Sequence, residues 1–202
     1  MRKLLLFGAL LCALCSCGSG NSNSHVGHEW VDLGLPSGLK WATCNVGASS
    51  PGDYGDYFAW GETESNDNYD NCISSGKLWD DIAGDSSRDA ARANWGGSWR
   101  MPTKDEFQEL IDNCTCTWTT QNGHKGYKLI SRKNGNSIFL PAAGYRRGGV
   151  LYDDGKLGFY RSSTPNKGRT DFAFSLYFFE GTRGVNWRYR YLGHSVRPVL
   201  ED

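Results

Sequence analysis

The chain has 202 residues and carries 22 Lys and Arg against 22 Asp and Glu, which suits one domain with a real core and excludes the basic surplus typical of nucleic-acid binding. Its 26 Gly, 8 Trp, 10 Tyr and 9 Phe predict many turns and short strands rather than long helices. No apolar run of about 18 residues follows the N-terminal segment, so no membrane span is expected in the body.

The N-terminus reads as an export signal. A basic start precedes an apolar run at residues 4–14, which is too short for a comfortable transmembrane helix. Leu-Cys-Ser-Cys then resembles a bacterial lipobox, so residues 1–16 are predicted to be a lipoprotein signal peptide and Cys17 the lipidated first residue. An ordinary signal peptide cut near Ser19 is the alternative. Loss of the leader leaves 20 basic against 22 acidic residues, because it removes Arg2 and Lys3.

The next segment, residues 17–27, is mainly Gly, Ser and Asn and predicts a flexible tether. His25 and His28 at its edge are expected to be a solvated pair. We therefore expect an exported protein that is lipid-anchored to the bacterial cell envelope, most simply at the outer membrane, and faces the periplasm or the exterior. The only membrane contact expected is the lipid anchor.

The first half of the body predicts little regular structure. Residues 28–48 read as two short strands around a Leu-Pro-Ser-Gly turn, and residues 53–64 as a strand followed by a loop. Residues 65–85 are polar and predict a surface loop. Residues 86–94 predict a short helix with a Ser or Asp cap.

The passage "WGGSWRMPTKDEF" (95–107) predicts architecture rather than a site. Its two glycines allow a sharp turn between two tryptophans that can fill a core. Arg100 is expected to tie loop carbonyls or a carboxylate together. Thr103 to Glu106 matches a capping box, which predicts a helix ending near Asn113 with an apolar face of Phe107, Leu110 and Ile111.

The second half predicts β structure. Asn134-Gly135 and Asp154-Gly155 each lie between apolar runs and predict hairpins. Residues 171–199 predict two or three further strands, with clear alternation over residues 172–176. The whole is therefore expected to be α+β, with one or two short helices in the first half and an irregular, hairpin-rich antiparallel sheet in the second.

Six ordered motifs in the body carry a family resemblance. They span about residues 28–200 and read "VDLGLPSGLKWATCNVGA", "GDYFAWGE", "NWGGSWRMPTKDEF", "NSIFLPAAGYR", "SLYF" and "GHSVRPV". The chain closely resembles the Fibrobacter succinogenes major paralogous domain, which is found in exported proteins of Bacteroides-like bacteria. That resemblance implies a single domain over residues 28–202 with a C-type-lectin-like fold. The segment from Ser98 to Phe107 also distantly resembles a motif of formylglycine-generating enzymes.

Four cysteines remain after the leader and the anchor: Cys44, Cys72, Cys114 and Cys116. Export permits disulfides, and the sequence leaves all three complete pairings open, although Cys114 and Cys116 are too close to favour each other. The family resemblance implies a Cys44–Cys114 disulfide, with the other two as free thiols or a second pair. No second cysteine pair or histidine completes a zinc site around Cys-x-Cys.

No catalytic chemistry is predicted. Formylglycine-generating enzymes use two cysteines near the C-terminal end, and this chain has none after Cys116, so fold likeness does not carry that activity. Thr164-Pro165-Asn166 resembles the Glu-Pro-Asn motif of C-type lectins without its acidic ligand. Asp153, Asp154 and Asp171 are possible calcium ligands, but Asp-Asp-Gly is more simply a turn. His194 is expected to be a packed strand residue, and no metal or cofactor is predicted.

Residues 145–191 hold the most plausible recognition surface, because Tyr, Trp and Arg supply much of the binding energy at interfaces and aromatic rings stack on sugars. Strand alternation implies that about half of these residues point inward. The candidate ligand-binding residues are Tyr152, Asp153, Arg161, Arg183, Asn186, Trp187, Arg188 and Tyr189, with Arg169 nearby.

Three functions fit these features. The first is a non-catalytic envelope lipoprotein that binds an extracellular glycan or protein ligand. The second is a structural or assembly component of the envelope. The third is a receptor diversified at adenine positions by a retroelement, as in some C-type-lectin-like proteins; Asp171, Arg183 and Tyr189 are compatible with that origin and Trp187 is not. None involves nucleic acid as a ligand.

Overall fold

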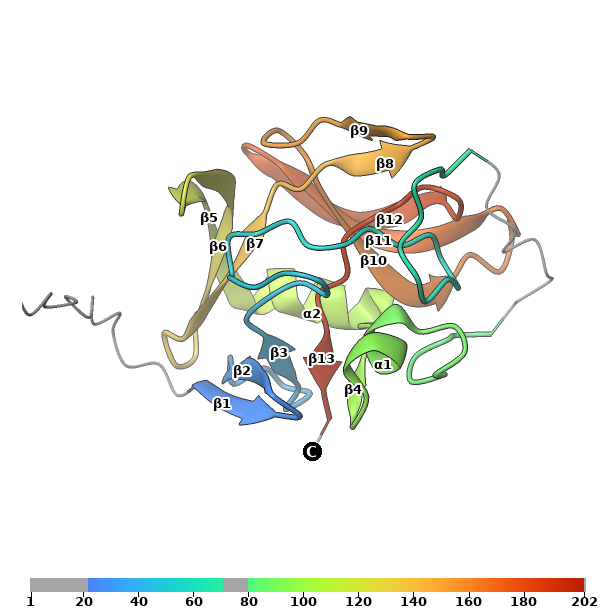
Figure 1. Cartoon of the computed structure of the whole chain (residues 1–202). Helices are drawn as coiled ribbons and strands as arrows, with labels where there is room; N and C mark the ends of the chain where they lie inside the picture. Colours follow the sequence, from blue (N-terminus) through green and yellow to red (C-terminus); the bar gives the residue numbers. More distant parts are fainter. Residues whose placement is uncertain (1–21, 71–79, 202) are drawn as a thin grey trace, which may run out of the picture.

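The computed structural model describes residues 22–70 and 80–201 as a mostly-sheet α+β fold with two short helices and antiparallel sheets (Figure 1). This confirms the predicted class. The helices are α1 (Ala90–Trp95) and α2 (Lys104–Asn113). The strands are β1 (Ser22–His25), β2 (His28–Asp32), β3 (Lys40–Ala42), β4 (Trp99–Arg100), β5 (Cys114–Gln121), β6 (His124–Ser131), β7 (Ser137–Pro141), β8 (Tyr145–Arg147), β9 (Val150–Tyr152), β10 (Gly158–Pro165), β11 (Phe172–Phe179), β12 (Thr182–Tyr189) and β13 (Val199–Leu200).

A five-stranded sheet, in the order β1-β2-β3-β13-β4, joins the two ends of the described chain. Val199 pairs with Trp41 on one side and with Arg100 on the other. The blue β1 and the C-terminus accordingly lie at the same end of the molecule (Figure 1). The domain is therefore closed by strands far apart in sequence.

The β1–β2 hairpin differs from the prediction for residues 17–27, because part of the expected tether pairs with β2. His25 and His28 are not a solvated pair. The ring of His28 stacks on Trp95 with centroids 3.8 Å apart, and the backbone N–H of Ser98 donates to Nε2 of His25 at 3.2 Å. These contacts hold the hairpin against the tryptophan-rich passage.

That passage forms part of the core, as predicted. Trp99 is fully buried, and it meets Trp95 edge to face with centroids 5.1 Å apart. Gly97 has φ +56°, and a Cβ there would collide with the ring of His25 and with Val26. A glycine is therefore required both by the backbone conformation and by the close approach of the hairpin.

Arg100 ties three segments together, which confirms the role predicted for it. Its guanidinium donates to both carboxylate oxygens of Glu106 at 2.7 and 2.8 Å, to Glu201 through Nε at 2.8 Å, and to the carbonyl of Met101 at 3.1 Å. Glu106 also completes the predicted capping box with Thr103 at the start of α2. The side chain of Arg100 is only 8% exposed.

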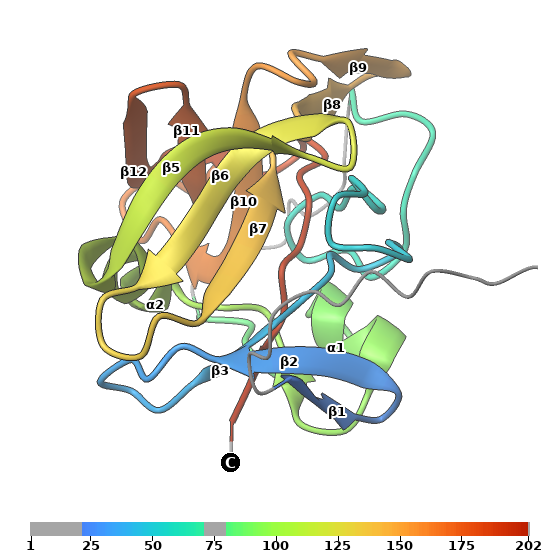
Figure 2. The ribbon, with the colours of Figure 1, turned by 90° about the vertical axis from the view of Figure 1, so that its left-hand side faces the viewer.

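The sheet β5-β6-β7 curves beside α2 (Figure 2). Its second turn is the predicted hairpin at Asn134-Gly135, where Ile130 pairs with Ser137. Its first turn, at Asn122-Gly123, was not predicted, although the Asn-Gly signal is present there and both residues adopt positive φ. The buried face of α2, with Phe107 at its centre, packs in one core cluster with this sheet and with β11.

The sheet β10-β11-β12 carries most of the predicted recognition residues. Leu176 and Phe178 of β11 point into the core cluster that contains α2. On the opposite face lie Ser175 and Arg161, which pair across β10 and β11 and are fully buried. The strands therefore lie between two covered layers over part of their length, and they reach solvent at β12, the outer strand.

The hairpin predicted at Asp154-Gly155 is wrong. β9 pairs backward with β8, and β10 pairs forward with β11. The Asp-Gly step instead belongs to the loop between β9 and β10, where the N–H of Gly155 donates to the carbonyl of Ala142 at 2.7 Å. The expected strand in residues 53–64 is reduced to an isolated bridge between Phe58 and His194.

Candidate functional site

The predicted recognition residues of β12 divide between the two faces of the sheet. Arg183, Trp187 and Tyr189 lie on the face that includes Phe172, because they pair with residues of that side of β11, whereas Asn186 and Arg188 alternate onto the other face. Trp187 is 39% exposed and Tyr189 is 44% exposed, both large values for aromatic side chains. β12 thus presents two exposed aromatic rings on one face and the guanidinium of Arg188 on the other.

A first cluster forms around the start of β11. The buried ring of Phe172 meets Trp187 edge to face at 4.6 Å between centroids and Tyr189 at 4.4 Å. The guanidinium of Arg169 lies 4.3 Å from the Phe172 centroid and 5.1 Å from that of Trp187. Because a buried ring holds two exposed rings and a cation, their geometry is set before any ligand arrives.

A second cluster lies on the other face of the sheet, around Arg188. Its guanidinium is 5.2 Å from the ring centroid of Phe159 and 5.0 Å from that of Tyr177. It also donates to the carbonyl of Trp187 at 2.8 Å. Burial lowers the pKa of Arg188, but an arginine stays charged at any ordinary pH, so a half-buried cation is held between rings.

The β8–β9 hairpin extends this cluster. Tyr145 stacks on Tyr152 at 5.5 Å and meets Phe159 edge to face at 5.6 Å. The pKa of Tyr145 is raised, mainly by burial. Two backbone hydrogen bonds of 2.8 and 2.9 Å between Arg146 and Gly193 fasten the hairpin to the C-terminal segment. In Figure 1 the hairpin stands over one end of the β10–β12 sheet.

Tyr191 extends the first cluster, because its ring stacks on Tyr189 at 5.1 Å. The two clusters lie on opposite faces of the sheet, on either side of β12. We call the combined set the aromatic–arginine surface; its members are Tyr145, Tyr152, Phe159, Arg169, Phe172, Tyr177, Trp187, Arg188, Tyr189 and Tyr191.

Arg161, a predicted ligand-binding residue, is corrected to an internal one. It is fully buried. Its guanidinium donates to the carbonyl of Leu192 at 2.6 Å, to that of Tyr189 at 3.2 Å and to Oγ of Ser175 at 3.4 Å. Arg161 thus fixes the chain at the end of β12 through these hydrogen bonds, and it has no exposed surface for a ligand.

Asp153 and Asn186 have local structural roles. Asp153 is exposed and has φ +57°. Its carbonyl accepts the backbone N–H groups of Lys156 and Leu157 at 3.0 and 2.9 Å. Asp153 therefore forms a turn, which was the simpler of the two interpretations of Asp-Asp-Gly. Oδ1 of Asn186 accepts the backbone N–H of Trp187 at 2.8 Å. Within residues 22–70 and 80–201, no three His, Cys, Asp or Glu side chains gather in a metal-binding arrangement.

His194 is a packed residue, as predicted. It is fully buried, its Nδ1 is 3.1 Å from Oγ of Ser175, and its ring stacks on Phe159 at 5.2 Å. Burial lowers the pKa of His194 well below its usual value, and the nearby Arg161 and Arg188 lower it further. A serine beside a neutral histidine resembles a nucleophile and its base, but both groups are closed to solvent, so no substrate can reach them.

The structure has Cys44, Cys114 and Cys116 as free thiols, so the Cys44–Cys114 disulfide implied by the family resemblance is not formed in it. Cys114 is buried in the core cluster with α2, and burial raises the pKa of its thiol to about 11. Cys44 is half-buried beside Thr43, in the loop that follows β3. The predicted lipidation site Cys17 and also Cys72 lie outside the described residues.

Five members of the surface were not among the predicted site residues: Tyr145, Phe159, Phe172, Tyr177 and Tyr191. Alternation in residues 172–176 indicated a strand, but it does not say which rings face β12. β8 pairs with β9 across the two-residue turn Gly148-Gly149, so the stacking of Tyr145 on Tyr152 could have been predicted from this local hairpin signal.

Comparisons with family models, with curated proteins and with solved structures found no match. Of the helices in the described part of the chain, none is long and apolar enough to cross a membrane.

Proposed function

We propose that this chain is a non-catalytic lipoprotein of the bacterial cell envelope whose single domain binds an extracellular glycan or protein ligand. In this proposal Cys17 carries the lipid and the domain is a C-type-lectin-like member of the Fibrobacter succinogenes major paralogous type. The six ordered sequence motifs support the family, and the two short helices with antiparallel sheets are compatible with the fold.

The observation that carries the binding role is the aromatic–arginine surface. Exposed rings of Tyr152, Trp187 and Tyr189 can stack on the apolar faces of sugars or fill pockets of a partner protein. The guanidinium of Arg169 lies 5.1 Å from the ring centroid of Trp187, and that of Arg188 lies over Phe159 and Tyr177 on the other face; such groups donate to carboxylates or hydroxyls. Clustered, exposed aromatic rings of this kind are typical of interaction sites.

The experiment is a glycan array combined with a pull-down from envelope extracts, using the chain from residue 18 onward. Trp187→Ala and Tyr189→Ala should each weaken binding about 30-fold, as expected for hot-spot residues worth about 2 kcal/mol. Val26→Ala removes another exposed apolar side chain, at the β1–β2 turn, and should leave binding unchanged.

The outcomes separate the functions. A glycan or protein ligand lost in Trp187→Ala supports recognition through this surface. A stoichiometric envelope partner that is retained in both surface variants supports the structural or assembly role instead. Absence of any ligand or partner refutes both. A near-copy of the gene's 3′ end beside a reverse transcriptase gene would support the diversified receptor, and absence of both removes it.

A further inference from the structure

A pocket of about 400 Å³ lies away from the first aromatic cluster, at the opposite end of β11. Phe172 and Phe179 are the two ends of this strand, seven residues apart, which corresponds to about 23 Å. The walls come from β5, β6, the loop between β9 and β10, and the β11–β12 turn. Its volume falls in the range of about 300–1,000 Å³ that is usual for small-ligand sites.

The walls of the pocket are fastened to one another. The N–H of Gly155 donates to the carbonyl of Ala142 at 2.7 Å, and the N–H of Ala142 donates to the carbonyl of Lys125 at 2.8 Å. Across the pocket, the hydroxyl of Tyr127 donates to the carbonyl of Phe179 at 3.1 Å. Three separate segments are therefore tied to β6, and the hollow exists without a ligand.

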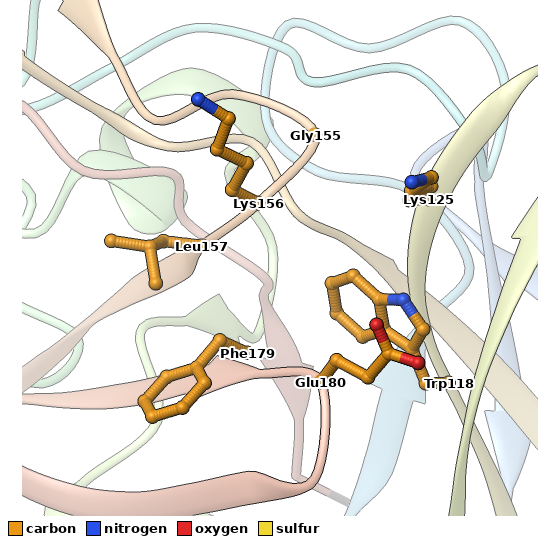
Figure 3. A pocket seen from close by; sticks show the side chains of 7 residues that line it. All are labelled: Trp118, Lys125, Gly155, Lys156, Leu157, Phe179 and Glu180. Carbon is orange, nitrogen blue, oxygen red and sulfur yellow. The ribbon is translucent and has the colours of Figure 1, made fainter.

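The lining combines apolar surface with charge of both signs. Figure 3 shows Leu157 and Phe179 on one side of the pocket and Trp118 with Glu180 on the other. Trp118 is half-buried, because it meets Tyr127 edge to face at 5.4 Å. The remaining charged groups are the amines of Lys125 and Lys156, both on exposed side chains at the rim.

This combination selects among ligand classes. A purely apolar ligand could pack on Trp118 and Phe179 but would leave the charges at the rim unused. A sugar ring offers an apolar C–H face for Trp118 or Phe179 and hydroxyls for Glu180 to accept from. Two ammonium groups against one carboxylate leave a net positive charge, which favours a ligand that itself carries a carboxylate.

We propose that this pocket binds a sugar residue that carries a carboxylate, such as a uronic acid within an extracellular glycan. The carboxylate pairs with Lys125, the ring packs on Trp118 or Phe179, and Glu180 accepts from ring hydroxyls. The inference deepens the proposed function, on which it rests, because it names the class of glycan and adds a second contact site to the aromatic–arginine surface.

The test is calorimetric titration of the chain from residue 18 onward with α-1,4-linked digalacturonate and with its neutral counterpart, α-1,4-linked galactobiose. The acidic disaccharide should bind at least about tenfold more tightly, since a charge-assisted hydrogen bond is the added contact. Lys125→Gln should remove that difference. Lys128→Gln is the matched control, because it changes an exposed lysine of the same strand that alternates onto the other face.

A second pair of variants covers the ring contact. Phe179→Ala removes an exposed side chain and should weaken both disaccharides, whereas Trp118→Ala should do the same but also loses packing against Tyr127. Equal affinity for the two disaccharides, or digalacturonate binding unchanged in Lys125→Gln, overturns the proposal. If binding is lost in Trp187→Ala but kept in Lys125→Gln, the pocket fails and the proposed function stands. If no glycan or envelope protein binds at all, both fail.

Discussion

The clamp formed by Arg100 allows a sharp test of the packing argument. Arg100→Met keeps the apolar stem and removes the guanidinium that joins β4 to the start of α2 and to Glu201. The side chains of Arg100 and Glu106 are 8% and 18% exposed, so the variant would leave a largely buried carboxylate without its cation. We therefore expect loss of stability rather than a change of fold.

The magnitude follows from burial. Removing one partner of a buried ion pair costs about 3–5 kcal/mol. The Glu106 carboxylate still accepts the N–H of Thr103 at 2.8 Å in the variant, which moves the estimate to the lower end. Glu201 is 60% exposed, so its contact adds at most about 1 kcal/mol. We expect a loss of about 3 kcal/mol, equal to about 6–12 °C in Tm for a domain of this size.

The assay is urea unfolding followed by tryptophan fluorescence and repeated as a thermal melt. Arg88→Met is the matched control, because the Arg88–Asp85 pair has the same chemistry but side chains that are 37% and 30% exposed. It should cost less than about 1 kcal/mol. A cycle with Glu106→Gln should give a coupling of at least about 1 kcal/mol. The reasoning is refuted if Arg100→Met is no more destabilising than Arg88→Met.

Three further predictions concern a histidine, a glycine and a thiol. Burial lowers the pKa of His194 and keeps the ring neutral. Its contribution to the unfolding free energy is therefore full above about pH 6.5, the pKa in the unfolded chain, and is lost as the pH falls toward the folded pKa. His194→Gln should flatten the pH dependence of the unfolding free energy between pH 7 and 5. Gly97→Ala should cost about 1–3 kcal/mol and expose the β1–β2 hairpin to hydrogen exchange, whereas Gly123→Ala, with similar φ and open space, should cost less. Cys114, with a pKa raised to about 11, should resist alkylation in the native chain at pH 8. A non-reduced digest should contain no Cys44–Cys114 peptide, because both thiols are free. Finding that peptide would show that the disulfide forms.

Local signals in the sequence predicted the elements that local interactions stabilise. The capping box at Thr103 and the i, i+3, i+4 apolar spacing of α2 are satisfied within one short segment, so they could be read directly. The Asn134-Gly135 turn is specified by two residues that tolerate positive φ. The burial of Trp95 and Trp99 agrees with their hydrophobicity and with the sharp turn that the two glycines between them allow.

Strand partners were less predictable, because they depend on distant segments. Asp154-Gly155 is as good a hairpin signal as Asn134-Gly135, yet β9 pairs with β8 and the Asp-Gly step is held against Ala142. A turn signal gives a change of chain direction, whereas pairing is decided by which strand edge is free. Tyr145 was missed as a partner of Tyr152 for a different reason, because the Gly148-Gly149 turn that joins their strands is a local hairpin signal that was not used.

The sequence by itself determined the α+β class, the start of α2, the tryptophan core and the concentration of Tyr, Trp and Arg in residues 145–191. Only the tertiary structure decided which of those residues face solvent. Arg161 of β10 and Arg188 of β12 lie on the same face of the sheet, on either side of β11. Arg161 is fully buried and donates to the carbonyl of Leu192, whereas Arg188 is half-buried over the rings of Phe159 and Tyr177. Alternation tells which residues share a face, but whether that face is covered depends on segments that arrive from elsewhere in the chain.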